Sequence, residues 1–221
     1  MLAYCIAEQQ GQTEIPASGV EGAPVKWIDV GNLRCFVSEF GARMPSEPVP
    51  EMVTAFHQVL QRIFAQTAII PFRFPTIVEN EDVLRQFVES RSTEYSSALH
   101  RLRNKVQIDV RISLNPSANM TNASSLNTSS SQSGKKYLED RRGRYRQAQS
   151  ILDEFRRVSN SVAEEWIQRD TASGIRGFAL MDRSAMPIFL ENVRRVVTPA
   201  DISARVTGPW PPSEFVEIAR E

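Results

Sequence analysis

QTAIIPFRFPTIV, residues 66–78 of this 221-residue chain, carries the strongest structural signal in the sequence. Two prolines, Pro71 and Pro75, bracket an aromatic and basic triplet in it. Each proline lacks a backbone N–H and pushes the residue before it towards extended geometry, so the stretch cannot be a helix. The sequence predicts a stiff edge strand here, or a strand broken by a kink.

The triplet Phe72, Arg73 and Phe74 is the first candidate binding site. Because side chains alternate along a strand, the two rings are predicted to lie on one side and the arginine on the other. Charged residues in strands mostly point to water, and the triplet can be an ordinary core strand whose arginine caps a neighbour. It can also recognise a partner, because an arginine fork on a stiff backbone is a good anchor.

Composition excludes several classes of function. Lys plus Arg equals Asp plus Glu at 26 each, so the overall charge does not favour nucleic acid or an anionic membrane. No apolar run approaches the roughly 18 residues of a membrane span. The first ten residues lack the basic start of a secretion signal, and we expect a cytoplasmic protein. Cys5 and Cys35 are expected to be buried thiols rather than a disulfide.

Residues 1–114 are predicted to form a ferredoxin-like α+β domain. Gly31 and Asn32 join two apolar runs and both tolerate positive φ, which predicts a hairpin. The order of strand, hairpin, helix, strand, helix, strand matches an elaborated ferredoxin-like arrangement. Periodicity predicts strands at 2–7, 25–30, 33–40, 66–78 and 105–114, and helices at 51–66 and 81–103.

The second half of the chain is predicted to be a linker followed by another α+β domain. Residues 115–133 are rich in Ser, Thr and Asn and are predicted to be a flexible linker. The C-terminal domain is expected at 134–207. Its first element is a long coiled-coil-like helix to about Asp170, whose apolar seam needs another helix beside it. A strand at 175–181, a helix at 185–197 and a strand at 201–207 are predicted to follow.

A Pro-rich tail is predicted at 208–221, because the run GPWPP at its start should end all regular structure. Trp210 in this run either fills the edge of the second core or docks the tail on the first domain or on a partner. Phe215 is the second aromatic residue of the tail. The predicted partner-binding residues are therefore Phe72, Arg73, Phe74, Trp210 and Phe215.

Catalytic, metal and cofactor motifs do not occur in the sequence. The two histidines, His57 and His100, lie on separate predicted helices, which does not favour a metal site or a histidine-based catalytic dyad. P-loop, GxGxxG and GxSxG patterns are missing. We expect no enzymatic activity, no metal site and no cofactor.

One basic cluster occurs between Lys135 and Arg146, with Glu139 and Asp140 inside it. On a helix these acids can pair with the basic residues at three- and four-residue offsets, which predicts a solvated face. An acidic protein partner is the alternative. RNA fits less well, because aromatic stacking residues are not interleaved.

Three segments resemble the gas vesicle protein L/F family, the accessory proteins that accompany the shell protein of gas vesicles. AFHQVLQRIFAQTAIIPFRFPTIV at 55–78 is similar to that family's helix followed by P-x-R-F-G-T. SGKKYLEDRR at 133–142 is similar to its S-G-x-x-Y-L-x-x-R, and TGPWPPSEFV at 207–216 to its T-G-P-W-P-P-Y-S-F-V. Pro75 stands where the family usually has Gly, and Ser213 and Glu214 stand where it has Tyr and Ser.

The resemblance implies a modified ferredoxin-like domain and a C-terminal α+β domain with paired long helices. It also implies binding to the hydrophobic shell protein and to other gas vesicle accessory proteins during vesicle assembly. The hypothetical mechanism is capture of an apolar shell-protein segment by an exposed strand edge or a cleft. The alternative is a regulatory module that holds a small metabolite in an interdomain groove, as ferredoxin-like domains often do.

Overall fold

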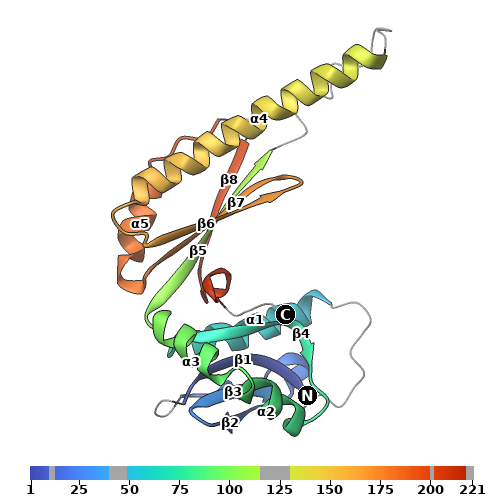
Figure 1. The fold of residues 1–221 in the computed structure, drawn as a ribbon, viewed down its shortest axis with the longest axis vertical. Coiled ribbons are helices and arrows are strands. Elements are labelled where there is room, and N and C mark those ends of the chain that lie inside the picture. Colours follow the sequence, from blue (N-terminus) through green and yellow to red (C-terminus); the bar gives the residue numbers. More distant parts are fainter. Residues whose placement is uncertain (10–12, 40–48, 115–129, 200–201, 218–221) are drawn as a thin grey trace. The chain divides into compact units, whose positions relative to one another are not determined.

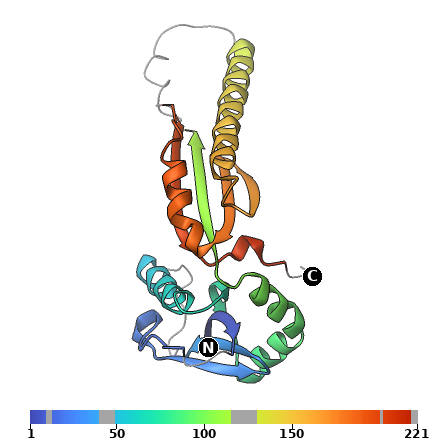
Figure 2. The same ribbon diagram turned by 90° about the vertical axis from the view of Figure 1, so that its left-hand side faces the viewer.

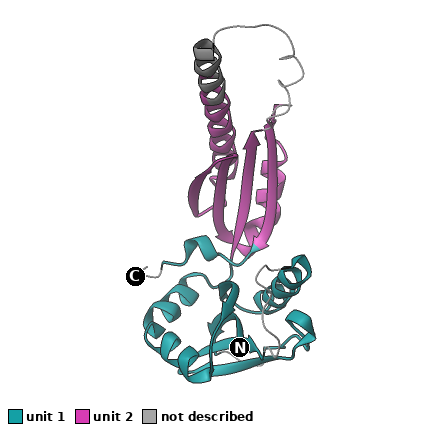
Figure 3. Cartoon of the chain, turned by 90° about the vertical axis from the view of Figure 1, so that its right-hand side faces the viewer, with its two compact units in different colours: residues 1–105, 210–221 teal, residues 106–209 magenta. Residues whose placement is uncertain are grey.

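The computed structural model describes residues 1–9, 13–39, 49–114, 130–199 and 202–217. The chain divides by its contacts into two compact units (Figure 3). Unit 1 consists of Met1–Lys105 and Trp210–Glu221, and unit 2 consists of Val106–Pro209. Each contains a four-stranded sheet (Figure 1). No helix in the described ranges is both long and apolar enough to cross a membrane.

The sheet of unit 1 has the strand order β2-β3-β1-β4, and every neighbouring pair is antiparallel. The predicted hairpin is present, with Gly31 at φ 58° in the first central position of its two-residue turn. A type II′ turn requires positive φ there, which glycine adopts without steric cost. The strands are β1 Leu2–Glu8, β2 Val25–Val30, β3 Leu33–Ser38 and β4 Ile69–Ile77.

Three helices cover this sheet, α1 Pro50–Phe64, α2 Glu81–Glu89 and α3 Ser92–Arg101. Pro50 occupies the first turn of α1, where its missing N–H costs nothing. The side chain of Asn80 caps α2 by accepting a hydrogen bond from the N–H of Val83. The single helix predicted at 81–103 is therefore two helices.

Both faces of the sheet in unit 1 are covered by helices. The central strand β1 is buried over residues 2–7 because α1 covers one face while α2 and α3 cover the other (Figure 2). Leu84 and Val88 of α2 share one core cluster with Tyr95 and Leu99 of α3. The bend between α2 and α3 lets both helices reach this cluster.

The sheet of unit 2 has the order β6-β7-β5-β8. Its strands are β5 Lys105–Leu114, β6 Glu165–Thr171, β7 Gly174–Asp182 and β8 Ile202–Trp210. Two helices, α4 Ser130–Ser159 and α5 Met186–Val193, contact each other and cover one face of it (Figure 1). The short 3-10 turn η3 Arg183–Ala185 precedes α5.

Two predictions about unit 2 need correction. The long helix ends at Ser159, whose hydroxyl bonds back to the carbonyl of Phe155, and residues 165–171 are strand β6. The run GPWPP does not stop regular structure at once, because β8 continues to Trp210. The buried face of α4 packs on α5 and β7, so its seam has a strand as well as a helix beside it.

The division into units differs from the predicted boundaries of 1–114, 134–207 and 208–221. β5 contributes its buried side chains to unit 2, because it lies between β7 and β8 in that sheet. Most of the predicted linker, residues 115–129, lies outside the described residues, and α4 begins at Ser130. The chain thus has a mixed α/β fold with two antiparallel sheets and, in the described ranges, the five helices α1–α5.

Candidate functional site

The edge strand β4 carries a large bulge at its proline-bracketed triplet. Along β1, Ala3 pairs with Thr76 of β4, and Cys5 pairs with Pro71. One residue of β1 is therefore opposite the four residues 72–75 of β4. The peptide bond before the second proline is cis. The bulge interrupts the regular alternation of side chains along the strand.

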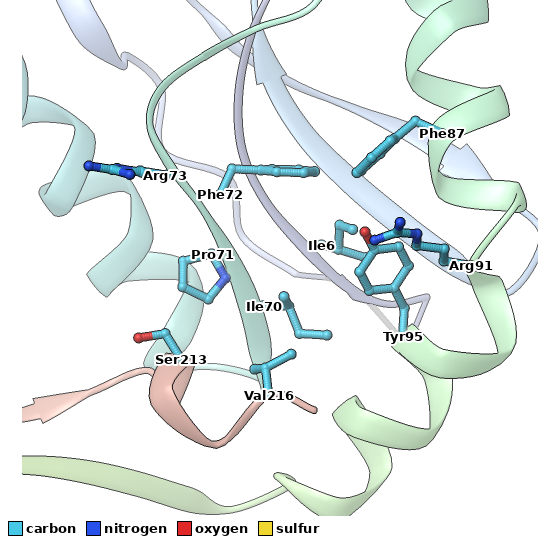
Figure 4. A pocket seen from close by; sticks show the side chains of 10 residues that line it. All are labelled: Ile6, Ile70, Pro71, Phe72, Arg73, Phe87, Arg91, Tyr95, Ser213 and Val216. Atoms are coloured by element: carbon cyan, nitrogen blue, oxygen red, sulfur yellow. The ribbon is translucent and has the colours of Figure 1, made fainter. Parts of the chain in front are cut away.

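As a result, the two phenylalanines of the triplet contact helices on opposite faces of the sheet. The ring of Phe74 lies 5.0 Å from the ring of Phe56 on α1, whereas the ring of Phe72 lies 6.3 Å from that of Phe87 on α2. The prediction that both rings share one side was wrong, because a bulge breaks the two-residue period. Figure 4 shows Phe72 pointing to Phe87 and the exposed Arg73 pointing the opposite way.

A groove of about 310 Å³ lies beside this bulge, within unit 1 (Figure 4). Side chains from β1, β4, α2, α3 and the C-terminal segment meet around it, and most of them are apolar. The lining residues are Ile6, Ile70, Pro71, Phe72, Arg73, Phe87, Arg91, Tyr95, Ser213 and Val216.

The charged lining residues of the groove are both cations. Arg73 and Arg91 carry guanidinium groups, and among the described residues that line the groove none carries a carboxylate. Burial is the main cause that raises the pKa of Tyr95 above its usual value; the nearby Arg91 partly opposes this, and Cys35 and Glu94 add to it. The phenol of Tyr95 therefore stays protonated at neutral pH and can donate a hydrogen bond.

The C-terminal segment forms one wall of the groove. After the 3-10 turn Ser213–Phe215, Val216 packs against the core cluster under α2 and α3. Phe215 is 2% exposed, and the guanidinium of Arg101 donates to its carbonyl. Arg101 also lies 3.9 Å from the carboxylate of Glu217. A buried ring and a charge-assisted hydrogen bond thus hold this wall in place.

The five residues predicted to bind a partner do not form one site. Phe72 and Arg73 line the groove. Phe74 is half-buried against α1 on the other face, and the buried Phe215 anchors the C-terminal segment from beneath. Trp210 is half-buried at the end of β8 and does not line the groove.

Sequence reasoning missed the groove residues that come from α2 and α3. Phe87 is 44% exposed, an unusual exposure for a large aromatic ring, and Arg91 precedes the first turn of α3. The apolar pattern of the sequence places both in the middle of one long helix. The pair Ser90–Arg91 carries no glycine or proline, so no ordinary breaker signal marks the bend.

Both edge strands of the unit 1 sheet carry features that oppose the addition of another strand. On β4, Pro71 and Pro75 have no N–H to offer, and the bulge lies between them. On β2, Asp29 pairs with Arg34, next to the pair of Val30 and Leu33 that closes the hairpin. The backbone groups of such a pair point away from the partner strand, so the carbonyl of Asp29 lies at the open edge of the sheet. The guanidinium of Arg85 on α2 donates to this carbonyl at 2.5 Å.

Cys5 and Cys35 are free, buried thiols in this sheet. Burial raises the pKa of both, that of Cys35 to about 12, so neither is a reactive thiolate at neutral pH. Over the described part of the chain, no group of three or more His, Cys, Asp or Glu side chains is arranged to hold a metal ion.

Comparison with known proteins identifies the family. The family model described as "Gas vesicle synthesis protein GvpL/GvpF" matches residues 1–217. The crystal structure of the gas vesicle protein GvpF from Anabaena sp. PCC7120 superposes with a TM-score of 0.79 and 17% identity, covering 99% of this chain and 96% of that one. GvpF from Microcystis aeruginosa gives 0.78 and 16%, covering 98% of each chain. No curated protein matches the sequence. The chain belongs to the GvpL/GvpF family of gas vesicle proteins, which takes part in gas vesicle formation.

Proposed function

We propose that this protein acts in gas vesicle assembly by holding an apolar segment of the hydrophobic shell protein in the groove beside β4. The observation that carries the proposal is the groove itself, a cavity of about 310 Å³ with a mostly apolar lining and an exposed aromatic ring, Phe87, at its side. Apolar concavities of this kind are where partner side chains gain most of their binding energy.

Groove capture fits unit 1 better than capture by strand addition. The prolines and the bulge remove regular N–H donors from β4, and Arg85 occupies an outward carbonyl of β2. A partner strand would therefore find few backbone groups in register on either edge. Side chains of the partner, inserted into the groove, are the remaining means of specific contact.

We further infer that unit 1 is the modified ferredoxin-like domain that the family resemblance implies. Its order β2-β3-β1-β4 with antiparallel neighbours supports this assignment. The described part of the connection between β1 and β2 has only the 3-10 turn Val20–Gly22 where a ferredoxin-like unit has a helix. A comparison of unit 1 alone with ferredoxin-like domains tests the assignment.

Other gas vesicle accessory proteins are proposed as further partners, and the cytoplasmic site of vesicle growth as the location. Arg73 is exposed and lines the groove, and Trp210 is half-buried and lies outside it, so both remain candidate contact residues. Phe74 and Phe215 are proposed to contribute indirectly, by fixing β4 and the C-terminal segment.

Binding of a small metabolite is the second candidate function. Arg91 and Tyr95 supply polar groups at one side of a cavity near the lower end of the roughly 300–1,000 Å³ typical of small-molecule sites. The apolar majority of the lining favours a protein segment. Calorimetric titration with the soluble extract of vesicle-forming cells, fractionated by size, separates the two candidates.

The test is co-purification with the shell protein. Tagged wild-type protein, co-expressed with shell protein, should retain it, and Phe87→Ala should retain about tenfold less, as expected when an aromatic contact with the partner is lost. Ile188→Ala, at a similarly exposed apolar residue of unit 2 with 53% exposure, is the matched control and should retain as much as wild type. Failure of wild type to retain shell protein, or equal retention by Phe87→Ala, would contradict the proposal.

A further inference from the structure

We propose that the groove selects a segment in which a large apolar side chain is flanked by carboxylates, so that its occupant is an acidic, apolar segment of a partner protein. This inference rests on the proposed function and specifies the chemistry of the same site. The inference follows from the positions of the charged side chains around the groove. Membership of the family does not imply these positions.

The floor of the groove provides for the apolar side chain. Ile6 is 1% exposed and Ile70 is 7% exposed, and both belong to the core cluster below the groove. The rings of Phe72 and Phe87, 6.3 Å apart, stand above them on two different elements (Figure 4). An aliphatic or aromatic side chain placed among these four would lose its contact with water.

One flank of the groove carries Arg91, which lies beside Tyr95 (Figure 4). The Arg91 side chain is half-buried, so water screens its charge less than that of a fully exposed arginine. A guanidinium has five N–H donors and binds a carboxylate with two of them while the others keep their own acceptors. The protonated phenol of Tyr95 is a further donor on the same flank.

The other flank carries Arg73, on the far side of β4 from Arg91 (Figure 4). A segment that crosses the bulge would therefore meet a cation, then an apolar hollow, then a second cation. None of the described residues that line the groove carries a carboxylate. The pattern complementary to this order is acidic, apolar, acidic, and a basic segment would be repelled.

The test uses labelled short peptides and the full-length protein. The probe has a Leu-Phe pair flanked on both sides by Glu, and two matched peptides carry Gln or Lys in place of Glu. Fluorescence anisotropy should show the Glu peptide binding about tenfold more tightly than the Gln peptide, the effect of one or two charge-assisted hydrogen bonds, with the Lys peptide weakest. Added salt should weaken binding of the Glu peptide and leave the Gln peptide nearly unchanged.

Substitutions assign the preference to the groove. Arg91→Gln should reduce the preference for Glu over Gln to about twofold or less, and Arg91→Lys should keep the salt dependence but lose the advantage of the planar fork. Arg111→Gln, at an exposed arginine of β5, is the matched control and should bind as wild type does. Arg73→Gln is a second substitution that tests the same preference for Glu over Gln and leaves the first turn of α3 unchanged.

The outcomes separate this inference from the proposed function. Three results would overturn the charge pattern alone, provided that shell protein is still retained. They are equal binding of the three peptides by wild type, an unchanged preference in both Arg91→Gln and Arg73→Gln, and a preference for a polyanion such as single-stranded RNA over the Glu peptide. Loss of shell-protein retention by wild type would overturn the proposed function. Competition by the chain's own C-terminal peptide would overturn the choice of a foreign partner.

Discussion

Two glycines in unit 2 differ in the space that their surroundings leave for a Cβ atom. Gly174 begins β7 at φ 150°, and a Cβ there would stand 2.0 Å from the backbone oxygen of Ile112. Gly143 lies within α4 with nothing within 4 Å of the position of a Cβ. A close backbone contact explains the first glycine, whereas the second has no steric reason to be glycine.

Alanine substitutions at these glycines should change stability in opposite directions. Gly174→Ala should lower the free energy of unfolding by about 3 kcal/mol, because backbone strain and overpacking add. Gly143→Ala should raise it by about 0.5–1 kcal/mol, because alanine loses less conformational freedom in a helix. Urea denaturation followed by circular dichroism measures both. A Gly174→Ala protein as stable as wild type would contradict the close approach of β7 to β5.

Tyr145 and Asp170 form a hydrogen bond between α4 and β6 that responds to pH. The bond to Asp170 is the main cause that raises the pKa of Tyr145 to about 12, and the same bond is the main cause that lowers the pKa of Asp170. Because the folded pKa of the tyrosine lies above its unfolded value near 10, its contribution to stability is complete below pH 10. It is lost as the pH rises from 10 to 12.

The stability difference between wild type and Tyr145→Phe should therefore be constant between about pH 6 and 9 and shrink above pH 10. Urea midpoints measured at several pH values give this difference. Ultraviolet titration should also show one tyrosine that ionises late in wild type and is missing from the variant. A difference that stays constant to pH 12 would mean that the hydrogen bond does not form.

The C-terminal segment is held in unit 1 by one buried ring, that of Phe215. Phe215→Ala should lower the stability of unit 1 by about 3–4 kcal/mol, the usual result of removing a buried phenylalanine. Phe215→Leu should cost less, because it keeps most of the apolar volume. Thermal unfolding of the two variants measures this. If Phe215→Ala unfolds at the wild-type temperature, the segment is not part of unit 1.

The pattern of apolar residues was enough to predict most strands and helices, because burial on one face imposes a period that the sequence must follow. The apolar pattern gave a wrong prediction where the same residues fit both a helical period and a strand period. Val162 and Trp166 continue the spacing of α4, but Trp166 lies in β6, where it pairs with Ala179 of β7. Its ring lies next to Gly177. The two-residue turn at 172–173 reads Ala-Ser, which carries none of the usual hairpin residues.

The groove could not be predicted in the same way, because its geometry depends on two local irregularities. The bulge in β4 sends Phe72 and Phe74 to opposite faces, and the bend at Ser90–Arg91 turns Phe87 and Arg91 to the same groove. Neither irregularity has a periodic signature. The sequence did mark β4 as unusual, since two prolines in one strand demand an edge position.

Along the chain, unit 2 is an insertion in unit 1. The chain leaves unit 1 after Lys105 and returns at Trp210, and the insertion begins and ends on the neighbouring strands β5 and β8. A Cβ added at Gly208 would lie 2.9 Å from the carbonyl oxygen of Gln107, so the two ends of unit 2 are close together. Domains with adjacent ends tolerate excision and insertion well.

A chain in which a short Gly/Ser linker replaces 106–209 should therefore fold as unit 1 alone. We expect dispersed amide resonances and a cooperative unfolding transition, because each unit has its own sheet and core. If isolated unit 1 also binds the Glu-flanked peptide, the groove needs no residue of unit 2. A disordered product would show that unit 1 depends on unit 2 for its stability.

The proposed contact is between the groove beside β4 and the shell protein while vesicles form. A photoreactive benzoyl-phenylalanine placed at Phe87 in vesicle-forming cells measures this directly, with the same group at Ile188 of α5 as the control. We predict a crosslink between position 87 and the shell protein and none from position 188. Equal crosslinking from both positions, or crosslinks from position 87 only to proteins other than the shell protein, would contradict this contact.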